Sequence, residues 1–331
     1  MSRRNELRLV AQVARMYYLE DTKQADIARY LNVSQASVSR LLKQSHDENL
    51  VKITVSAPRG TYPELEKGLR HKFSVKDVIV AHCEEDREPQ ILEAIGDAAA
   101  YFLETSLSEG EVVGISSWSQ SLLRMVDNIH PFKRVSAAKV VQTLGGMGNP
   151  LVQVHATQLT SRLAQLLNAQ AILLPAQGVT SSKEAKLVLS GDPFVRSAIE
   201  EFRNITLAVI GIGAVDPSEM LANSGNVFTP DELTNLKSLG AVGDISLRFF
   251  DAQGAPVNAP LDKRVIGITL AELQALPQVV AVAGGGRKVA AIRGALSGGY
   301  VDVLVTDQFT AEKLLEDVST PLEAAYVGNH E

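Results

Sequence analysis

The segment 283–292, AGGGRKVAAI, places three consecutive glycines and a lysine at the start of a predicted helix. Glycines let a backbone approach a ligand closely, and the N–H groups at a helix start attract anions. Lys288 adds a compact positive charge. The spacing matches neither the P-loop pattern nor the dinucleotide-binding fingerprint, which excludes nucleotide hydrolysis. The segment therefore indicates a site for a small polar ligand.

Four more loops rich in Gly, Ser and Thr follow predicted strands, and open α/β sheets bind their ligands at such strand ends. In the loop 114–123, GISSWSQSLL, serine hydroxyls and backbone N–H groups can hold an anion or sugar hydroxyls. A single loop of this kind is commonly structural, but five in one domain favour a small polar ligand. The other three loops are 143–149, 175–181 and 211–217.

Three further side chains have two open interpretations each. Asp244, in AVGDISLRFF, either accepts hydrogen bonds from sugar hydroxyls or is a turn or cap residue. The same two roles are open for Asp307, in LVTDQ. Trp118, the single tryptophan, either packs in the core or offers an apolar platform to a sugar face.

Residues suited to catalysis or metal binding are few. The six histidines have no metal-ligand spacing, and no G-x-S-x-G motif occurs. The single cysteine, Cys83, excludes an intrachain disulfide and a cysteine-built zinc site. We expect no enzyme activity, no metal and no cofactor. The charged first segment lacks the apolar core of a secretory signal, and no apolar run is long enough for a membrane span, so we expect a cytoplasmic protein.

From about residue 75 onward, short apolar runs alternate with helical patterns. Near-continuous Val, Ile and Leu runs predict parallel strands covered on both faces by crossover helices. The segment 247–257 instead predicts a hairpin with its turn at Gln253–Gly254. We expect a Rossmann-like parallel-sheet α/β domain, with helices over 89–107, 154–168 and 287–297 and strands over 75–81, 111–116, 138–144, 169–176, 205–213, 278–285 and 301–307.

Residues 1–58 have a helical period instead. Thr22 is the expected cap of a second helix over 23–31, Asn32 and Val33 form a turn, and Ser34 caps a third helix. Two short helices joined by such a turn predict a helix-turn-helix. The expected inward residues are Leu7, Val10, Ala14, Tyr17, Ala25, Ile27, Ala28, Leu31, Val38, Leu41 and Leu42.

The outer face of the third helix is polar and cationic. Residues 1–59 carry a net charge of +4 and the remainder −10, a distribution typical of a basic head that meets a polyanion. Gln suits adenine edges, Arg suits guanine, and Ser or Lys suits phosphates. An ordinary exposed helix is the alternative. The face consists of Gln35, Ala36, Ser39, Arg40 and Lys43.

The stretch VSQASVSRLL resembles the recognition helix of lac-type repressors, which implies Gln35, Ala36 and Arg40 as base readers. Thr22, Gln24, Ser34 and Ser37 are further expected DNA contacts. After this helix, LVKITVSAP predicts a short strand or wing, and PRGTYPELE marks the domain boundary.

The whole chain resembles the SorC/DeoR-type sugar-binding transcriptional regulators of bacteria. The resemblance implies a helix-turn-helix head, a homotetramer, and an effector domain related to sugar-phosphate isomerases and deaminases that binds a phosphorylated sugar or polyol. The segments that carry it include QADIARYLNVSQASVSRLLKQSHDENLVKI, VVGISSWSQSL, VVQTLGG, AVGDISLRFFDAQGAPV, RVIGITLAEL and VVAVAGGGRKVAAIRGALSGGYVDVLVTD.

By this resemblance Asp244 and Lys288 are effector contacts. The first ligand loop departs from the family pattern, because Ser119 and Ser121 replace the usual Gly and Thr and Ser117 is inserted before Trp118. Both a sugar phosphate and an unphosphorylated polyol therefore remain open. The complete expected set is Ser116, Ser117, Trp118, Ser119, Ser121, Gly145, Gly146, Gly213, Asp244 and Lys288.

The leading hypothesis is a DNA-binding regulator, a repressor of a carbohydrate or polyol operon, whose operator affinity is controlled by the effector. Residues 1–58 are expected to bind double-stranded operator DNA, and residues 59–331 to bind the effector and form a dimer or tetramer. The alternative is a sugar-phosphate isomerase or hydrolase with an accessory helical head. That alternative leaves the helix-turn-helix pattern unexplained.

Overall fold

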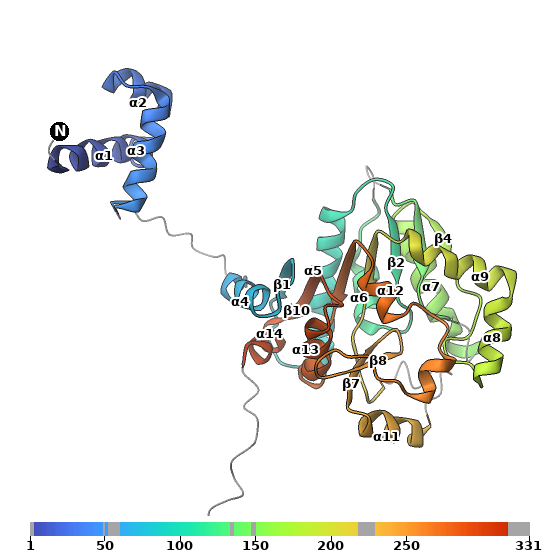
Figure 1. Cartoon of the computed structure of the whole chain (residues 1–331). Coiled ribbons are helices and arrows are strands. Elements are labelled where there is room, and N and C mark those ends of the chain that lie inside the picture. Colours follow the sequence, from blue (N-terminus) through green and yellow to red (C-terminus); the bar gives the residue numbers. More distant parts are fainter. Residues whose placement is uncertain are drawn as a thin grey trace, which may run out of the picture. The chain divides into compact units, whose positions relative to one another are not determined.

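The computed structural model describes residues 3–48, 50–51, 60–132, 136–146, 150–217 and 229–316 (Figure 1). The chain divides into two compact units, Met1–Pro58 and Arg59–Glu331. The strand or wing expected over 50–58 lies, apart from residues 50 and 51, outside the described residues, and those two belong to no strand.

The first unit contains three helices, α1 (Arg3–Tyr18), α2 (Gln24–Leu31) and α3 (Gln35–Asp47). Asn32 ends α2 in the left-handed conformation, with φ of 52°, a conformation that Asn tolerates better than most residues. Ser34 caps α3 as expected, because its side chain accepts a hydrogen bond from the Ser37 N–H. The apolar sides of the helices meet in one core of Val13, Ile27, Ala28, Val38 and Leu42.

Two expectations for this unit were wrong. Thr22 does not cap α2; the residue at the cap position is Lys23, which makes no side-chain cap hydrogen bond. The Thr22 hydroxyl instead donates to the Glu20 carbonyl oxygen. Ala25 is exposed, whereas Ile27 and Ala28 of the same helix are buried.

The second unit is built on a seven-stranded sheet in the order β1-β10-β9-β5-β2-β3-β4, with every neighbouring pair parallel. Each apolar run predicted from the sequence contributes one strand, which confirms the expected fold class. The strands are β1 (Asp77–Ala81), β2 (Val112–Ile115), β3 (Lys139–Gln142), β4 (Gln170–Ile172), β5 (Leu207–Ile210), β9 (Gln278–Val282) and β10 (Val303–Asp307).

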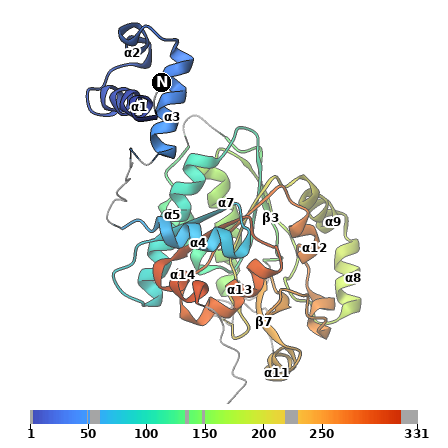
Figure 2. The same cartoon turned by 60° about the vertical axis from the view of Figure 1, so that its left-hand side comes forward.

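Helices cover both faces of this sheet, as runs buried on both sides require. Alternate strand residues enter opposite cores: Ala208 and Ile210 face one core, and Leu207 and Val209 face the other. On the face of the Ala208 and Ile210 core, Figure 2 shows the helices α4, α13 and α14 side by side. That face contains α4 (Pro63–Phe73), α9 (Pro193–Glu200), α12 (Leu270–Gln274), α13 (Val289–Ser297) and α14 (Gln308–Leu315), and the other contains α5 (Glu88–Ser106), α6 (Gln120–Asn128) and α7 (Pro150–Leu166).

A small antiparallel sheet lies beside the carboxyl ends of the large one. Its strands are β6 (Gly213–Ala214), β7 (Ala241–Ile245) and β8 (Arg248–Asp251). The predicted turn at Gln253–Gly254 is present, with φ of +81° at Gly254, but its return arm forms only an isolated bridge between Phe250 and Pro256. The main partner of β8 is β7, across a turn at Ser246–Leu247 that the sequence pattern does not indicate.

Among the described residues, the remaining helices are α8 (Lys183–Gly191) and α11 (Pro230–Ser238), with short 3-10 turns at Glu201–Asn204, Pro260–Arg264 and Gly286–Lys288. The helix expected over 287–297 is therefore α13 preceded by a 3-10 turn, and Lys288 is the cap residue of α13. Within the described residues, none of the helices has the length and apolar character that a membrane crossing requires.

Candidate functional site

A cavity of about 70 Å³ lies where the strand ends of the large sheet meet the small sheet. Seven of the ten effector contacts expected from the sequence line it: Ser116, Ser117, Trp118, Ser119, Gly213, Asp244 and Lys288. Further lining residues were missed, among them Gln120, Gly211, Ser246, Leu247 and Arg287. Arg287 stands beside Lys288 in the glycine-rich segment, so its charge was a signal that could have found it.

Asp244 is the carboxylate of the cavity. It lies on β7 opposite Gly213 of β6, and a Cβ at Gly213 would overlap the Asp244 Oδ1 atom, so glycine is required there. Its Oδ2 atom accepts a hydrogen bond of 2.9 Å from the Leu247 N–H. Burial raises the pKa of Asp244 to about 6, although the hydrogen bond from Leu247 and the charge of Lys288 act in the opposite direction.

Lys288 brings a positive charge to the same cavity from the start of α13. Its ammonium makes no hydrogen bond or ion pair that the described residues supply, and burial lowers its pKa to about 8. The charge of Arg287 also lowers this pKa, while Glu88 and Asp244 raise it. Arg287 itself lies 3.5 Å from Glu88. The cavity therefore presents a hydrogen-bond acceptor and two cations to one small volume.

The serine hydroxyls of the loop 116–121 are used mainly to build the loop. Ser116 accepts from the Gly211 N–H at 3.4 Å, and Ser119 caps α6 by accepting from the Leu122 N–H at 3.4 Å. Ser117 donates to the Leu144 carbonyl at 3.1 Å and accepts from the Gln142 side chain at 3.0 Å. These bonds hold the loop and position its backbone.

The structure does not bring the other three expected contacts to the cavity. Ser121 is fully buried in α6 and is not among the lining residues. Gly145 and Gly146 also lie outside the lining, and a Cβ at Gly145 would approach the Gln177 backbone to 2.6 Å. The Gly145 N–H donates to the Ile266 carbonyl at 3.0 Å, so this glycine serves close packing between loops.

Trp118 packs in a small apolar cluster, which is the first of its two interpretations. It also lines the cavity, so its role as an apolar platform for a sugar stays a prediction. Trp118, Ser246 and Leu247 all have positive φ, of 64°, 51° and 62°. Non-glycine residues in this conformation are strained, and such strain gathers at functional sites. The Trp118 Nε1 atom and the Ser246 hydroxyl are buried without a hydrogen-bond partner in the described part of the chain.

Of its two interpretations, Asp307 has the structural one. It caps α14: its Oδ1 atom accepts from the Thr310 N–H at 2.9 Å and its Oδ2 atom from the Thr310 hydroxyl at 2.6 Å. The Gly285 N–H also donates to Oδ2, at 3.0 Å. Asp307 therefore holds the glycine-rich segment from behind and is absent from the cavity lining.

In the first unit, the polar face of α3 is exposed as the sequence predicted, at Gln35, Ala36, Ser39, Arg40 and Lys43. The other expected DNA contacts lie around it. Ser34 and Ser37 join their hydroxyls at 2.9 Å, and Arg40 donates to the Ser37 hydroxyl at 3.2 Å. Thr22 and Gln24, at the beginning of α2, are partly exposed.

Comparison with known proteins decides the family. Residues 60–316 match the family model described as "Putative sugar-binding domain". A deoxyribonucleoside regulator of Bacillus subtilis (strain 168) is 31% identical over 95% of this chain and 99% of its own length. This chain belongs to the SorC/DeoR family of sugar-binding transcriptional regulators. The resemblance noted in the sequence is thereby confirmed.

Other SorC/DeoR regulators agree with this assignment. The sorbitol operon regulator of Klebsiella pneumoniae is 27% identical over 96% of this chain and all of its own length. The full-length crystal structure of that regulator, SorC, matches 94% of this chain with a TM-score of 0.71. A solved domain of a transcriptional regulator DeoR from Pseudomonas syringae pv. tomato is 43% identical and matches 77% of this chain, and all of its own, with a TM-score of 0.62.

Proposed function

We propose that this SorC/DeoR regulator represses a carbohydrate or polyol operon and that a sugar phosphate, sugar or polyol in the cavity controls its operator affinity. The main support is the cavity itself, where Asp244 faces the same volume as Lys288 and Arg287. A carboxylate accepts hydrogen bonds from hydroxyls, and the two cations attract a phosphate. Relatives named as a sorbitol operon regulator and a deoxyribonucleoside regulator support a ligand of this class.

Residues 1–58 are the proposed DNA-binding domain and residues 59–331 the effector and oligomerisation domain, in line with the two compact units. The proposed base readers on α3 are Gln35, Ala36 and Arg40, and Lys43 contacts phosphate. Paired copies of one helix-turn-helix read two half-sites, so the operator-bound species is a homo-oligomer. Its partner is double-stranded DNA, which places its action in the cytoplasm.

An effector can control operator affinity only if it binds two conformations of the regulator with different affinities. In this proposal the cavity is where the effector distinguishes those conformations. Substitutions in the cavity should then change the response to the effector and leave operator binding without effector intact. The rival enzyme hypothesis uses the same Asp244 and Lys288 as an acid–base pair. Relatives named as regulators favour binding over turnover.

The test is a titration of operator DNA with and without candidate effectors, for wild type and Lys288→Ala. Lys288→Ala is expected to fold and bind operator but to lose the response, because a charge-assisted hydrogen bond to phosphate contributes roughly 1.5–3 kcal/mol. Lys313→Ala is the matched control, since that lysine pairs with Asp86 at 2.8 Å outside the cavity lining.

A full response in Lys288→Ala contradicts the cavity as the effector site. Loss of the response to sugar phosphates alone, with the response to free polyols kept, identifies Lys288 as the phosphate contact and leaves the serine loop without that role. Chemical conversion of a candidate, followed by product analysis, is the outcome that supports the enzyme instead.

A further inference from the structure

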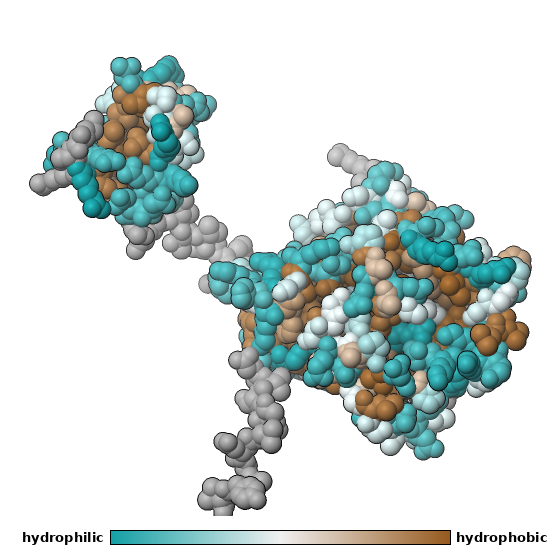
Figure 3. Space-filling model, viewed as in Figure 1, coloured by the Kyte–Doolittle hydropathy of each residue, from teal (hydrophilic) through white to brown (hydrophobic). Residues whose placement is uncertain are grey.

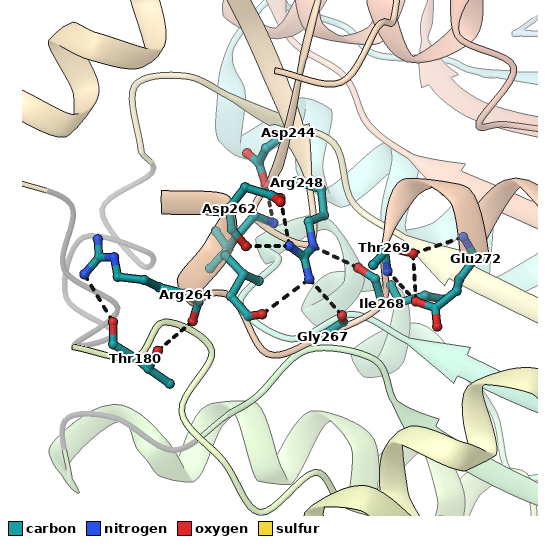
Figure 4. Close-up of polar contacts among 11 residues, drawn as sticks. Thr180, Asp244, Arg248, Asp262, Arg264, Gly267, Ile268, Thr269 and Glu272 are labelled. Atoms are coloured by element: carbon teal, nitrogen blue, oxygen red, sulfur yellow. Dashed lines mark hydrogen bonds and ion pairs between the residues drawn. The ribbon is translucent and has the colours of Figure 1, made fainter. Parts of the chain in front are cut away.

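A buried arginine behind the cavity holds an irregular segment of the chain. Arg248 begins β8 and is only 6% exposed. Its guanidinium faces the segment Asp262–Ile268, here called the strap, which begins inside the 3-10 turn Pro260–Arg264 and ends shortly before α12 (Figure 4). The strap forms no strand of either sheet. Its carbonyl groups therefore need partners other than a strand ladder.

Arg248 uses all five of its N–H groups on the strap, four on backbone carbonyls and one on a carboxylate. Nε donates to the Ile268 carbonyl at 3.3 Å, and Nη2 donates to the carbonyls of Val265 at 3.3 Å and Gly267 at 3.1 Å. Nη1 donates to the Asp262 carbonyl at 2.9 Å and to its carboxylate at 2.7 Å. The other two strap carbonyls with partners in the described part of the chain accept from backbone N–H groups, Arg264 from Thr180 and Ile266 from Gly145. Arginine is the side chain with five donors in a fixed planar fork, and lysine offers three.

The strap in turn supports the apolar wall of the cavity. Val265 is fully buried and belongs to the same small cluster as Trp118, Leu144 and Leu247, all three of which line the cavity. The strap backbone also holds the loop after β3, since the Ile268 N–H donates to the Thr143 carbonyl at 2.8 Å. A chain of packed contacts thus runs from the guanidinium through the strap to Trp118.

We propose that Arg248 is a positioning residue: by fixing the strap against the β7–β8 hairpin, it sets the shape of the cavity wall formed by Trp118, Leu144 and Leu247. Its neighbour in sequence, Leu247, contributes both the N–H that Asp244 accepts and a side chain of that wall. The relevance to effector binding rests on the proposed function, whereas the effect on the wall does not.

Trp118 reports on the wall directly, because it is the single tryptophan of the chain. The experiment measures Trp118 emission and its quenching by acrylamide in the full-length protein, well below the unfolding temperature, for wild type, Arg248→Lys and Arg248→Met. Both variants are expected to shift the emission to longer wavelength and to increase quenching, with Arg248→Lys less affected. Titration with inorganic phosphate, followed by the same emission, is expected to show about tenfold weaker binding in Arg248→Lys.

The matched control is Arg293→Lys. Arg293 also donates to backbone carbonyls, those of Lys313 at 2.8 Å and Glu316 at 3.2 Å, but it touches neither the strap nor the cavity lining. If Arg248 has a purely structural role, the Arg248 variants lose thermal stability as Arg293→Lys does, while Trp118 emission and quenching stay unchanged. Unchanged emission and quenching in folded Arg248 variants therefore overturns the proposal.

If the Arg248 variants do not fold, Asp262→Ala tests the same contact from the other side. It removes one of the five acceptors, from a side chain that is 45% exposed, and leaves the strap carbonyls in place. A smaller change of Trp118 in the same direction is expected, and no change contradicts the proposal. A wild type that ignores phosphate counts against a phosphorylated effector, while the acrylamide result still decides the role of Arg248.

Discussion

At the scale of single residues, the cavity buries two ionisable groups where neither charged form is well solvated. Asp244 is 6% exposed, and within the described residues its carboxylate accepts one hydrogen bond, from the Leu247 N–H. Its pKa therefore rises to about 6, and that of Lys288 falls to about 8. Both groups remain charged at pH 7, and a ligand with hydroxyls and an anion would compensate both of them.

Asp244→Asn is accordingly expected to stabilise the protein at pH 7. The folded-state pKa of about 6 lies above the ordinary value of 3.8, so the folded chain binds this proton more tightly than the unfolded chain. The resulting stabilisation is present below about pH 4 and is lost as the pH rises to about 6, which amounts to roughly 3 kcal/mol. The amide oxygen still accepts from the Leu247 N–H.

Thermal unfolding midpoints at pH 5 and pH 7 check this prediction. The wild type should lose stability between the two values relative to Asp244→Asn, whose own side chain does not titrate. Asp216→Asn serves as control, because Asp216 makes an exposed ion pair with Lys237 outside the cavity lining. Parallel pH dependences for wild type and Asp244→Asn would show that Asp244 is not destabilised by its burial.

At the scale of elements, the β7–β8 hairpin is joined by two residues with positive φ, as in the tight turns that normally contain Asn and Gly. Here the residues are Ser246 and Leu247, and both line the cavity. The turn therefore stores strain at the site. Only the surrounding structure, including Asp244 and the strap, keeps it in that shape.

Ser246→Gly is expected to stabilise the fold by about 1 kcal/mol, because glycine relieves the strained φ and the change removes a buried hydroxyl without a partner. Chemical denaturation measures the change. Gly254→Ala is the control of opposite sign: Gly254 has φ of +81°, and a Cβ there would overlap Gly298, so this variant should be destabilised. A less stable Ser246→Gly would show that the hydroxyl has an undetected favourable contact.

The helix α3 presents its polar residues in one exposed row. Arg40→Ala is expected to cost roughly 1–3 kcal/mol on operator DNA and to relax preference at one base position. Lys43→Ala is expected to weaken binding to all sequences alike and to reduce the dependence on salt, since it removes a phosphate contact. Titrations on operator and random DNA at several salt concentrations separate the two. Equal losses on both DNAs for Arg40→Ala would remove it from the base-reading role.

At the scale of the whole molecule, the second unit exposes large apolar side chains on α8 and α9. Val188 is 75% and Phe194 78% exposed, and Figure 3 shows apolar surface near α8. Exposed apolar surface of this kind commonly marks contacts between protein chains. A second copy is the expected occupant, because paired half-sites require paired DNA-binding units.

Light scattering at micromolar concentration is expected to find a dimer or tetramer without DNA. The double variant Val188→Glu and Phe194→Glu should lower the mass and weaken operator binding. Tyr101→Glu is the control, since Tyr101 is also exposed, at 69%, but lies on α5. A monomeric wild type would contradict the proposed assembly, and an unaffected mass in the double variant would place the interface elsewhere.

The sequence alone determined the parts whose residues carry their own local signal. Seven apolar runs identified the strands of the parallel sheet, because strands buried on both faces need apolar side chains at every position. The cap at Ser34 and the exposed face of α3 followed from helical spacing. Asp244 stood out as a charge beside apolar strand residues and Lys288 as a charge after three glycines, and the structure places both at one cavity.

Only the tertiary structure decided which loops meet. The strand order brings the loops after β2 and β5 to the cavity, while Gly145 packs against Gln177. The turn at Ser246–Leu247 contains no glycine or asparagine, so the sequence gives no local signal for it. Contacts distant in sequence hold these two residues at positive φ. The role of Arg248 is of the same kind: its five acceptors lie 14 to 20 residues away and converge only after the strap has folded over it.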